Sequence, residues 1–101
     1  MLKDFNVINI KTSFLSLLAD IVGKEEISLS FDSPLTIREI LVLLSSMIGR
    51  NFEENIFSSM GTLNKYIILG INGKDIRRFD GLDSIIKDGD EISFLPAIAG
   101  G

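Results

Sequence analysis

The clearest structural signal in this sequence is a long helix that begins near Thr36. Thr36 is a good N-cap residue and Glu39 stands three positions later, which is the spacing of a capping box. Five apolar residues then recur at helical spacing: Ile37, Ile40, Leu41, Leu44 and Ile48. Gly49 follows as a common C-terminal cap. The sequence therefore predicts a helix over residues 36–48, and its apolar face needs a second layer to bury it.

Two segments before this helix alternate apolar and polar residues, which is the pattern of a half-buried strand. Residues 8–14 and 27–31 both show this alternation. The apolar stretch 15–22 between them is closed by Gly23 and predicts a short helical or irregular turn. The two strands are therefore expected to pair as a hairpin.

Three more strands are predicted after the helix. Residues 66–71 form a short, dense apolar run, typical of a strand buried on much of both faces. Asn72-Gly73 is a strong hairpin dipeptide and would join this run to a short edge strand over 74–78. A tight turn at 88–90 then precedes a last alternating strand, which Pro96 is expected to stop.

The segment 50–65 is less regular than its neighbours. Its apolar residues predict a second short helix: Phe52, Ile56, Phe57 and Met60. This helix is expected to end at Gly61. Farther along, Leu82, Ile85 and Ile86 predict only a small apolar patch.

The order of these elements predicts an α+β fold of two layers, with a mixed four- to five-stranded sheet covered by one long helix. A hairpin, a crossover helix and further strands that end beside the first strand describe the β-grasp, or ubiquitin-like, arrangement. The first and last strands are then expected to run parallel at the centre of the sheet. Residues 1–96 would form the domain and residues 97–101 a flexible C-terminal tail.

The composition excludes several kinds of chemistry. The 101 residues include neither cysteine nor histidine, so thiol nucleophiles, disulfides and the usual neutral-pH acid–base group are missing. The net charge of −4 disfavours a nucleic-acid partner, since phosphate attracts basic surfaces. No apolar run is long enough to span a membrane, and a cytoplasmic protein is expected.

Two charged groups have structural interpretations. Asp88, Asp90 and Glu91 belong to one tight turn, which favours turn chemistry over a metal site. Arg77 and Arg78 are interpreted as solvated charges of the edge strand, although a partner contact is a second interpretation.

The C-terminal sequence resembles a known family. The run 88–101, Asp-Gly-Asp-Glu-Ile-Ser-Phe-Leu-Pro-Ala-Ile-Ala-Gly-Gly, is similar to the end of the small subunit of molybdopterin synthase. The terminal glycine pair is also shared with the thiamine sulfur carrier and archaeal ubiquitin-like modifiers. The order of strands, turn and helix before it fits the same subunit, so the resemblance covers residues 8–101. The chain departs from the family at Ala97, where a second proline is usual, and in its longer 51–63 segment.

This resemblance implies that the α-carboxylate of Gly101 is the working group. A ubiquitin-activating-like adenylyltransferase would use ATP to convert it to an acyl-adenylate, which then receives sulfur or an acceptor amine. Gly100 and Gly101 suit a narrow enzyme channel because glycine has no Cβ. Leu95, Pro96 and Ile98 flank the tail and are the expected partner-binding residues. The chain itself would bind no cofactor or metal and would have no catalytic site of its own.

Three functions fit this sequence. In the first, the chain is a thiocarboxylated sulfur carrier that works with the large subunit of molybdopterin synthase in molybdenum cofactor biosynthesis. In the second, it is a protein modifier joined through Gly101 to lysines of target proteins. In the third, it is a β-grasp interaction module without carboxylate chemistry. The match over both the tail and the front half favours the sulfur carrier.

Overall fold

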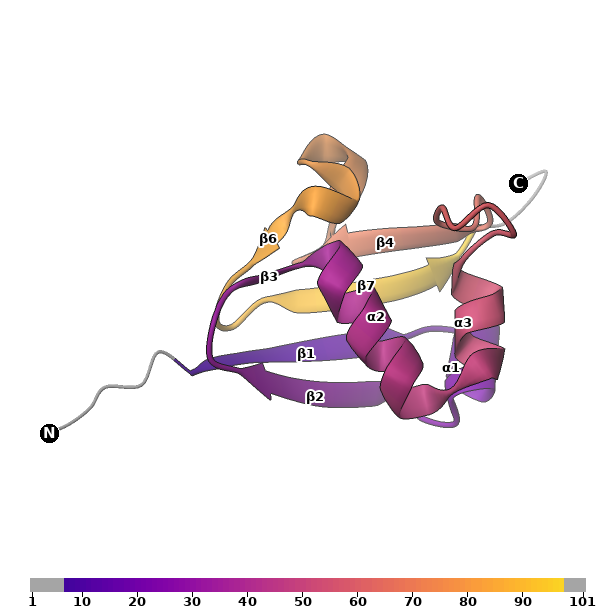
Figure 1. Ribbon diagram of the computed structural model, residues 1–101, viewed down its shortest axis with the longest axis horizontal. Helices are drawn as coiled ribbons and strands as arrows, with labels where there is room; N and C mark the ends of the chain where they lie inside the picture. The colour runs from indigo at the N-terminus through magenta and orange to yellow at the C-terminus, as the bar shows by residue number, and fades with distance from the viewer. Residues whose placement is uncertain (1–6, 98–101) are drawn as a thin grey trace, which may run out of the picture.

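Five strands form the main sheet of the computed structural model, which describes residues 7–97 (Figure 1). In chain order the elements are β1 (Ile8–Phe14), α1 (Leu17–Val22), β2 (Glu26–Phe31), β3 (Leu35–Thr36), α2 (Ile37–Ile48), α3 (Arg50–Ile56), β4 (Ile67–Ile71), β5 (Lys74–Asp75), the 3₁₀ turns η1 (Ile76–Arg78) and η2 (Gly81–Asp83), β6 (Ile85–Ile86) and β7 (Glu91–Pro96). None of the helices in this range has the length and hydrophobicity that crossing a membrane requires.

The sheet has the order β2-β1-β7-β4-β5. β1 and β2 pair antiparallel as the expected hairpin, and β7 returns to lie parallel to β1, with Thr12 beside Ile92 and Phe14 beside Phe94. β4 pairs antiparallel with the other side of β7. The prediction of an α+β, β-grasp fold with parallel first and last strands at the centre is therefore confirmed.

Helix α2 begins as its sequence predicts. The Thr36 hydroxyl accepts a hydrogen bond from the Glu39 amide at 3.2 Å, and a Glu39 carboxylate oxygen accepts one from the Thr36 amide at 2.9 Å. Four residues of its apolar face are completely buried against the sheet: Ile37, Ile40, Leu41 and Leu44. The helix crosses one face of the sheet (Figure 1), and the core lies between these two layers.

An aromatic cluster joins the sheet to the second helix. Phe14 of β1 stacks on Phe94 of β7 with ring centroids 4.8 Å apart. Phe52 of α3 meets both rings edge-on, with centroids 6.1 Å from each. All three side chains are buried, so this cluster fixes α3 against the end of the sheet where β7 leads into the C-terminal tail.

The opposite face of the sheet is polar over β1 and β2. Residues of β1 and β2 that alternate with the core positions are half-buried or exposed, and most are hydrophilic: Asn9, Lys11, Ser13, Glu26, Ser28 and Ser30. The two short helices α1 and α3 lie at one end of the sheet, with α1 partly behind α3 in this view (Figure 1). α2 is the one long covering helix, as predicted.

The structure corrects the expectations for two segments. The helix expected to reach Gly61 ends at Ile56, because the chain then turns into a short bridge between Phe57 and Leu63 and leaves Met60 exposed. The edge strand expected over 74–78 covers only Lys74–Asp75. The Asp75 carboxylate accepts a hydrogen bond from the Arg77 amide, which starts a 3₁₀ turn in place of the strand.

A second, two-stranded sheet was not predicted. β3 and β6 pair antiparallel, with Leu35 opposite Ile86. This pairing places the Ser84 carbonyl where it accepts a hydrogen bond from the Ile37 amide at 3.0 Å. The apolar patch that the sequence showed at Leu82, Ile85 and Ile86 is therefore partly a strand that holds the beginning of α2.

Candidate functional site

The site is the point where β7 leaves the sheet. As far as Phe94, β7 lies between β1 and β4, and the Leu15 amide donates the last hydrogen bond from the β1 side, to the Phe94 carbonyl at 3.0 Å. Beyond Phe94, β7 pairs only with β4, with Ile68 opposite Leu95 and Ile67 opposite Pro96. The Ala97 amide then donates to the Tyr66 carbonyl at 2.7 Å. Ala97 is therefore the last described backbone anchor before the C-terminal glycines.

Pro96 occupies a position that tolerates proline. Proline has no N–H and would break a hydrogen-bonded ladder at the centre of a sheet. By the level of Pro96, β1 has already ended and its chain has turned toward α1, so β7 has become an edge strand on that side. The expectation that the last strand stops at Pro96 is confirmed.

Leu95 and Ile68 form a small apolar patch at the base of the tail. They lie opposite each other across β7 and β4, and the alternation of both strands places them on the sheet face away from α2. Both are half-buried, as is Pro96. We call Ile68, Leu95 and Pro96 at this end of β7 the tail-base patch. Ile68 and Leu95 are on the sheet face away from α2, and Pro96, one position later in the strand, is on the other face at the same end.

The structure locates two of the five predicted site residues. Leu95 and Pro96 are adjacent in the tail-base patch, with partly exposed side chains that a partner can contact. Ile98, Gly100 and Gly101 lie outside the described residues. Ile68 was not predicted, since its place beside Leu95 depends on the pairing register of two strands that lie far apart in the sequence.

A cleft of about 310 Å³ lies next to the last anchor, and Ala97, Ile68 and Arg77 are among its lining residues. The Arg77 guanidinium donates two hydrogen bonds to the Asp75 carboxylate, from Nε at 3.0 Å and from Nη2 at 2.6 Å. The hydrogen bonds from Arg77 lower the pKa of Asp75, and the same carboxylate raises the pKa of Arg77. Arg77 is thus a solvent-exposed charge, as predicted, but it lies in the 3₁₀ turn η1 rather than in an edge strand and is paired with Asp75.

The acidic turn at the other end of β7 has a structural role. Asp88 accepts a hydrogen bond from the Asn9 amide at 2.7 Å, and Asp90 accepts one from the Lys87 amide at 2.8 Å. Asp90 also accepts a hydrogen bond from the side-chain nitrogen of Asn72. The side-chain oxygen of Asn72 in turn accepts a hydrogen bond from the Glu91 backbone amide at 2.9 Å. These carboxylates tie together the turns that precede β7, as turn chemistry predicts.

No group of three or more acidic side chains that could hold a metal ion occurs within residues 7–97.

The comparisons with known proteins agree with this fold. The sequence model of the ThiS family matches residues 13–101. A putative sulfur carrier protein of Archaeoglobus fulgidus is 36% identical over 67 residues, which are 66% of this chain and 75% of the relative. Ubiquitin-related modifier 1 of Saccharomyces cerevisiae is 31% identical over 94% of this chain and 100% of its own.

The fold is also similar to that of solved structures. The small archaeal modifier protein 1 of Methanosarcina acetivorans superposes with a TM-score of 0.79 at 28% identity, over 94% of this chain and 98% of its own. The relatives carry both carrier and modifier names, and all are small ubiquitin-like proteins. The family match covers most of the chain and includes the end of β7 and the glycine pair, so the chain belongs to the ThiS family of ubiquitin-like sulfur carrier proteins.

Proposed function

We propose that this chain is a sulfur carrier whose reacting group is the α-carboxylate of Gly101. In the first step, a carboxylate oxygen attacks the α-phosphorus of ATP on an activating enzyme, and pyrophosphate leaves. In the second step, a sulfide-level sulfur nucleophile displaces AMP and leaves a thiocarboxylate on the chain. The observation that carries this proposal is that β7 leads directly to a last described backbone hydrogen bond at Ala97, four residues before the end of the glycine pair in the sequence.

The position of the anchor limits how far the reacting carbon extends. Four residues follow Ala97 in the sequence, and an extended chain spans about 3.3–3.6 Å per residue, which gives a reach of about 13–14 Å. A partner therefore has to bind the body of the protein close to the tail base if it is to act on the carboxylate. The tail-base patch offers apolar surface at that place, and burial of such surface favours association.

We infer that the partner supplies the catalytic groups and that the chain acts as its co-substrate. The sequence contains no cysteine and no histidine, which are the common nucleophile and acid–base residues of acyl-transfer enzymes. A glycine-ended carrier needs neither, because its reacting group is the backbone carboxylate itself. The charge that develops during adenylation would be stabilised by the activating enzyme and its ATP.

For the sulfur acceptor, we propose the precursor of molybdopterin, with the large subunit of molybdopterin synthase as the second partner. The support is the run 88–101, which is similar to the end of the small subunit of that enzyme. A second candidate function is protein modification, in which a lysine amine of a target protein displaces the activated acyl group and forms an isopeptide bond. Its support is the match to ubiquitin-related modifier 1 over nearly the whole chain.

The experiment measures ATP–pyrophosphate exchange with the cognate activating enzyme. Deletion of Gly101, or addition of one residue after it, moves the carboxylate by about 3.5 Å. Misplacement of a reacting group by ~1 Å can cost about 10²-fold in rate, so both variants are expected to lose exchange. Gly100→Val is also expected to lose it, because a β-branched side chain widens and stiffens the end of the chain.

Lys87→Gln serves as the control, since it changes an exposed side chain in the turn at the other end of β7 and leaves the carboxylate in place. Equal exchange by the wild type and the Gly101 deletion would contradict both the carrier and the modifier function. An intact mass after incubation with the activating enzyme, ATP, a sulfur donor and a lysine-bearing target protein then distinguishes the carrier from the modifier. Exchange of one oxygen for sulfur indicates the carrier, and a lysine conjugate indicates the modifier.

A further inference from the structure

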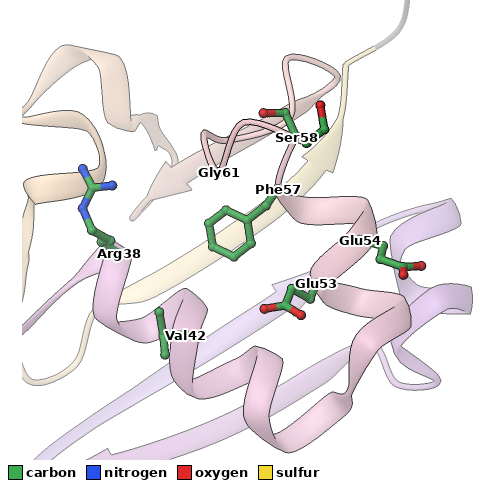
Figure 2. A pocket seen from close by; sticks show the side chains of 8 residues that line it. Arg38, Val42, Glu53, Glu54, Phe57, Ser58 and Gly61 are labelled. Carbon is green, nitrogen blue, oxygen red and sulfur yellow. The ribbon is translucent and has the colours of Figure 1, made fainter.

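A groove on the helical layer lies away from the tail-base patch. It encloses about 680 Å³ between α2, α3 and the loop that follows α3 (Figure 2). The Phe57 ring lies between the two helices, with Val42 on one side and Glu53 on the other. Val42 is 61% exposed although it belongs to α2, whose opposite face is buried against the sheet. The groove therefore combines an accessible apolar floor with an acidic edge.

The charges of this groove are unbalanced. Its one cation, Arg38, is already bound by the Asp83 carboxylate, with nitrogen–oxygen distances of 3.2 and 3.4 Å. Glu53 and Glu54 both line the groove, and no cation among residues 7–97 forms an ion pair with either. Figure 2 shows the Glu53 carboxylate on the side of Val42 and Phe57 and the Glu54 carboxylate on the outer side of α3. An acidic edge beside an apolar floor is complementary to a segment that carries lysine or arginine next to an apolar side chain.

A second copy of this chain is a poor occupant for the same reason. The chain has a net charge of −4, so two copies repel each other, and bringing like charges together at an interface opposes binding. A basic partner experiences the opposite effect, since the acidic edge attracts it and raises its rate of association.

The loop after α3 connects this groove to the tail base. Phe57, which forms the floor of the groove, is bridged to Leu63. Leu63 in turn lines the cleft that Ala97 also lines, and Tyr66 at the end of the loop accepts the Ala97 hydrogen bond. Figure 1 shows this loop next to the end of β7. A protein that holds the C-terminal tail is thus within reach of the groove.

We propose that this groove is a docking site for a basic, amphipathic segment of the enzyme that activates the C-terminus. This inference rests on the proposed function, because it takes the activating enzyme as the partner. The groove contributes binding of the globular body, whereas the tail contributes the reacting group. Loss of the groove should therefore raise the KM for the carrier and leave kcat unchanged.

The test compares two charge-neutralised variants in the exchange assay with the cognate activating enzyme. In E53Q/E54Q the KM for the carrier is expected to rise by at least about fivefold with kcat unchanged, and its dependence on salt should weaken. E25Q/E26Q is the matched control, since it removes two adjacent glutamates at the start of β2, outside the groove. Val42→Ser tests the apolar floor at an exposed position and is expected to raise KM without unfolding the chain.

A direct titration of the enzyme without ATP separates this inference from the proposed function. A chain that lacks Gly101 is expected to lose exchange but to bind the enzyme, and the substitution E53Q/E54Q should weaken that binding by a similar factor. The wild-type chain could bind the enzyme, and E53Q/E54Q could bind it more weakly, although the wild type shows no ATP–pyrophosphate exchange. This result would contradict the proposed function and support the groove as a docking site. An unchanged KM and Kd in E53Q/E54Q, an equal rise in both glutamate variants, or no binding at all would overturn the docking site.

Discussion

Removal of the Phe52 side chain is expected to cost a large part of the folding stability. Phe52 is 1% exposed and its ring meets Phe14 and Phe94, with centroids 6.1 Å from each. A buried Phe→Ala substitution costs about 3–5 kcal/mol, and lost aromatic pairs contribute to the upper part of that range. We therefore expect Phe52→Ala to lower the free energy of unfolding by about 4 kcal/mol. For a domain of this size, that loss corresponds to a drop in Tm of about 15–30 °C.

Urea unfolding followed by circular dichroism measures this loss, and Phe79→Ala provides the matched control. Phe79 has the same side chain but is 49% exposed, so its truncation should cost about 1 kcal/mol. The two variants remove the same atoms, and only their burial and aromatic contacts differ. A loss below about 1 kcal/mol in Phe52→Ala, or one no larger than in Phe79→Ala, would refute the role of the aromatic cluster in holding α3 on the sheet.

Three further predictions concern local features. Thr36→Ala removes the N-cap of α2 and should lower the free energy of unfolding by about 1 kcal/mol in urea titrations, whereas Thr36→Ser should retain most of it. Asn72→Ala should cost about 1–3 kcal/mol, because Asn72 has a φ of 53° and its side chain binds Asp90 and Glu91; Asn72→Gly should relieve the backbone part only. The pKa of Asp75 is lowered by Arg77, so its stabilising effect is present above the ordinary carboxyl pKa and disappears as pH falls through the lowered value; the stability difference between wild type and Asp75→Asn should therefore shrink below about pH 4 in unfolding curves measured at several pH values.

Elements with strong local signals were predictable from the sequence. The capping box at Thr36 and Glu39 fixes the start of α2 through contacts within one turn, and the alternation along β1 places its core positions without knowledge of any other strand. The hairpin at Asn72-Gly73 was predictable for the same reason, because the left-handed backbone that it needs is a property of those two residues. In each case the determining interactions lie a few residues apart.

Features that depend on distant partners were not predictable. β3 and β6 are two residues each, and neither has a pattern until the fold places Leu35 opposite Ile86. The edge strand after Asn72-Gly73 is short because one side-chain contact between Asp75 and Arg77 competes with continued pairing. Likewise, the sequence identified Leu95 and Pro96 at the candidate site but not Ile68, whose contribution depends on the register of β4 against β7.

The arrangement around β7 is consistent with the proposal that the C-terminal carboxylate is the reacting group. Along the stretch that ends at Phe94, β7 is held by a strand on each side and by a buried ring stacked on Phe14. At Leu95 only β4 remains as a neighbour, and at Ala97 one hydrogen bond to Tyr66 marks the last described contact. The number of backbone partners thus decreases over three residues, from a strand on each side at Phe94 to one hydrogen bond at Ala97. The same gradient explains why changes in the core should alter stability, whereas changes at the tail base should alter binding of the partner.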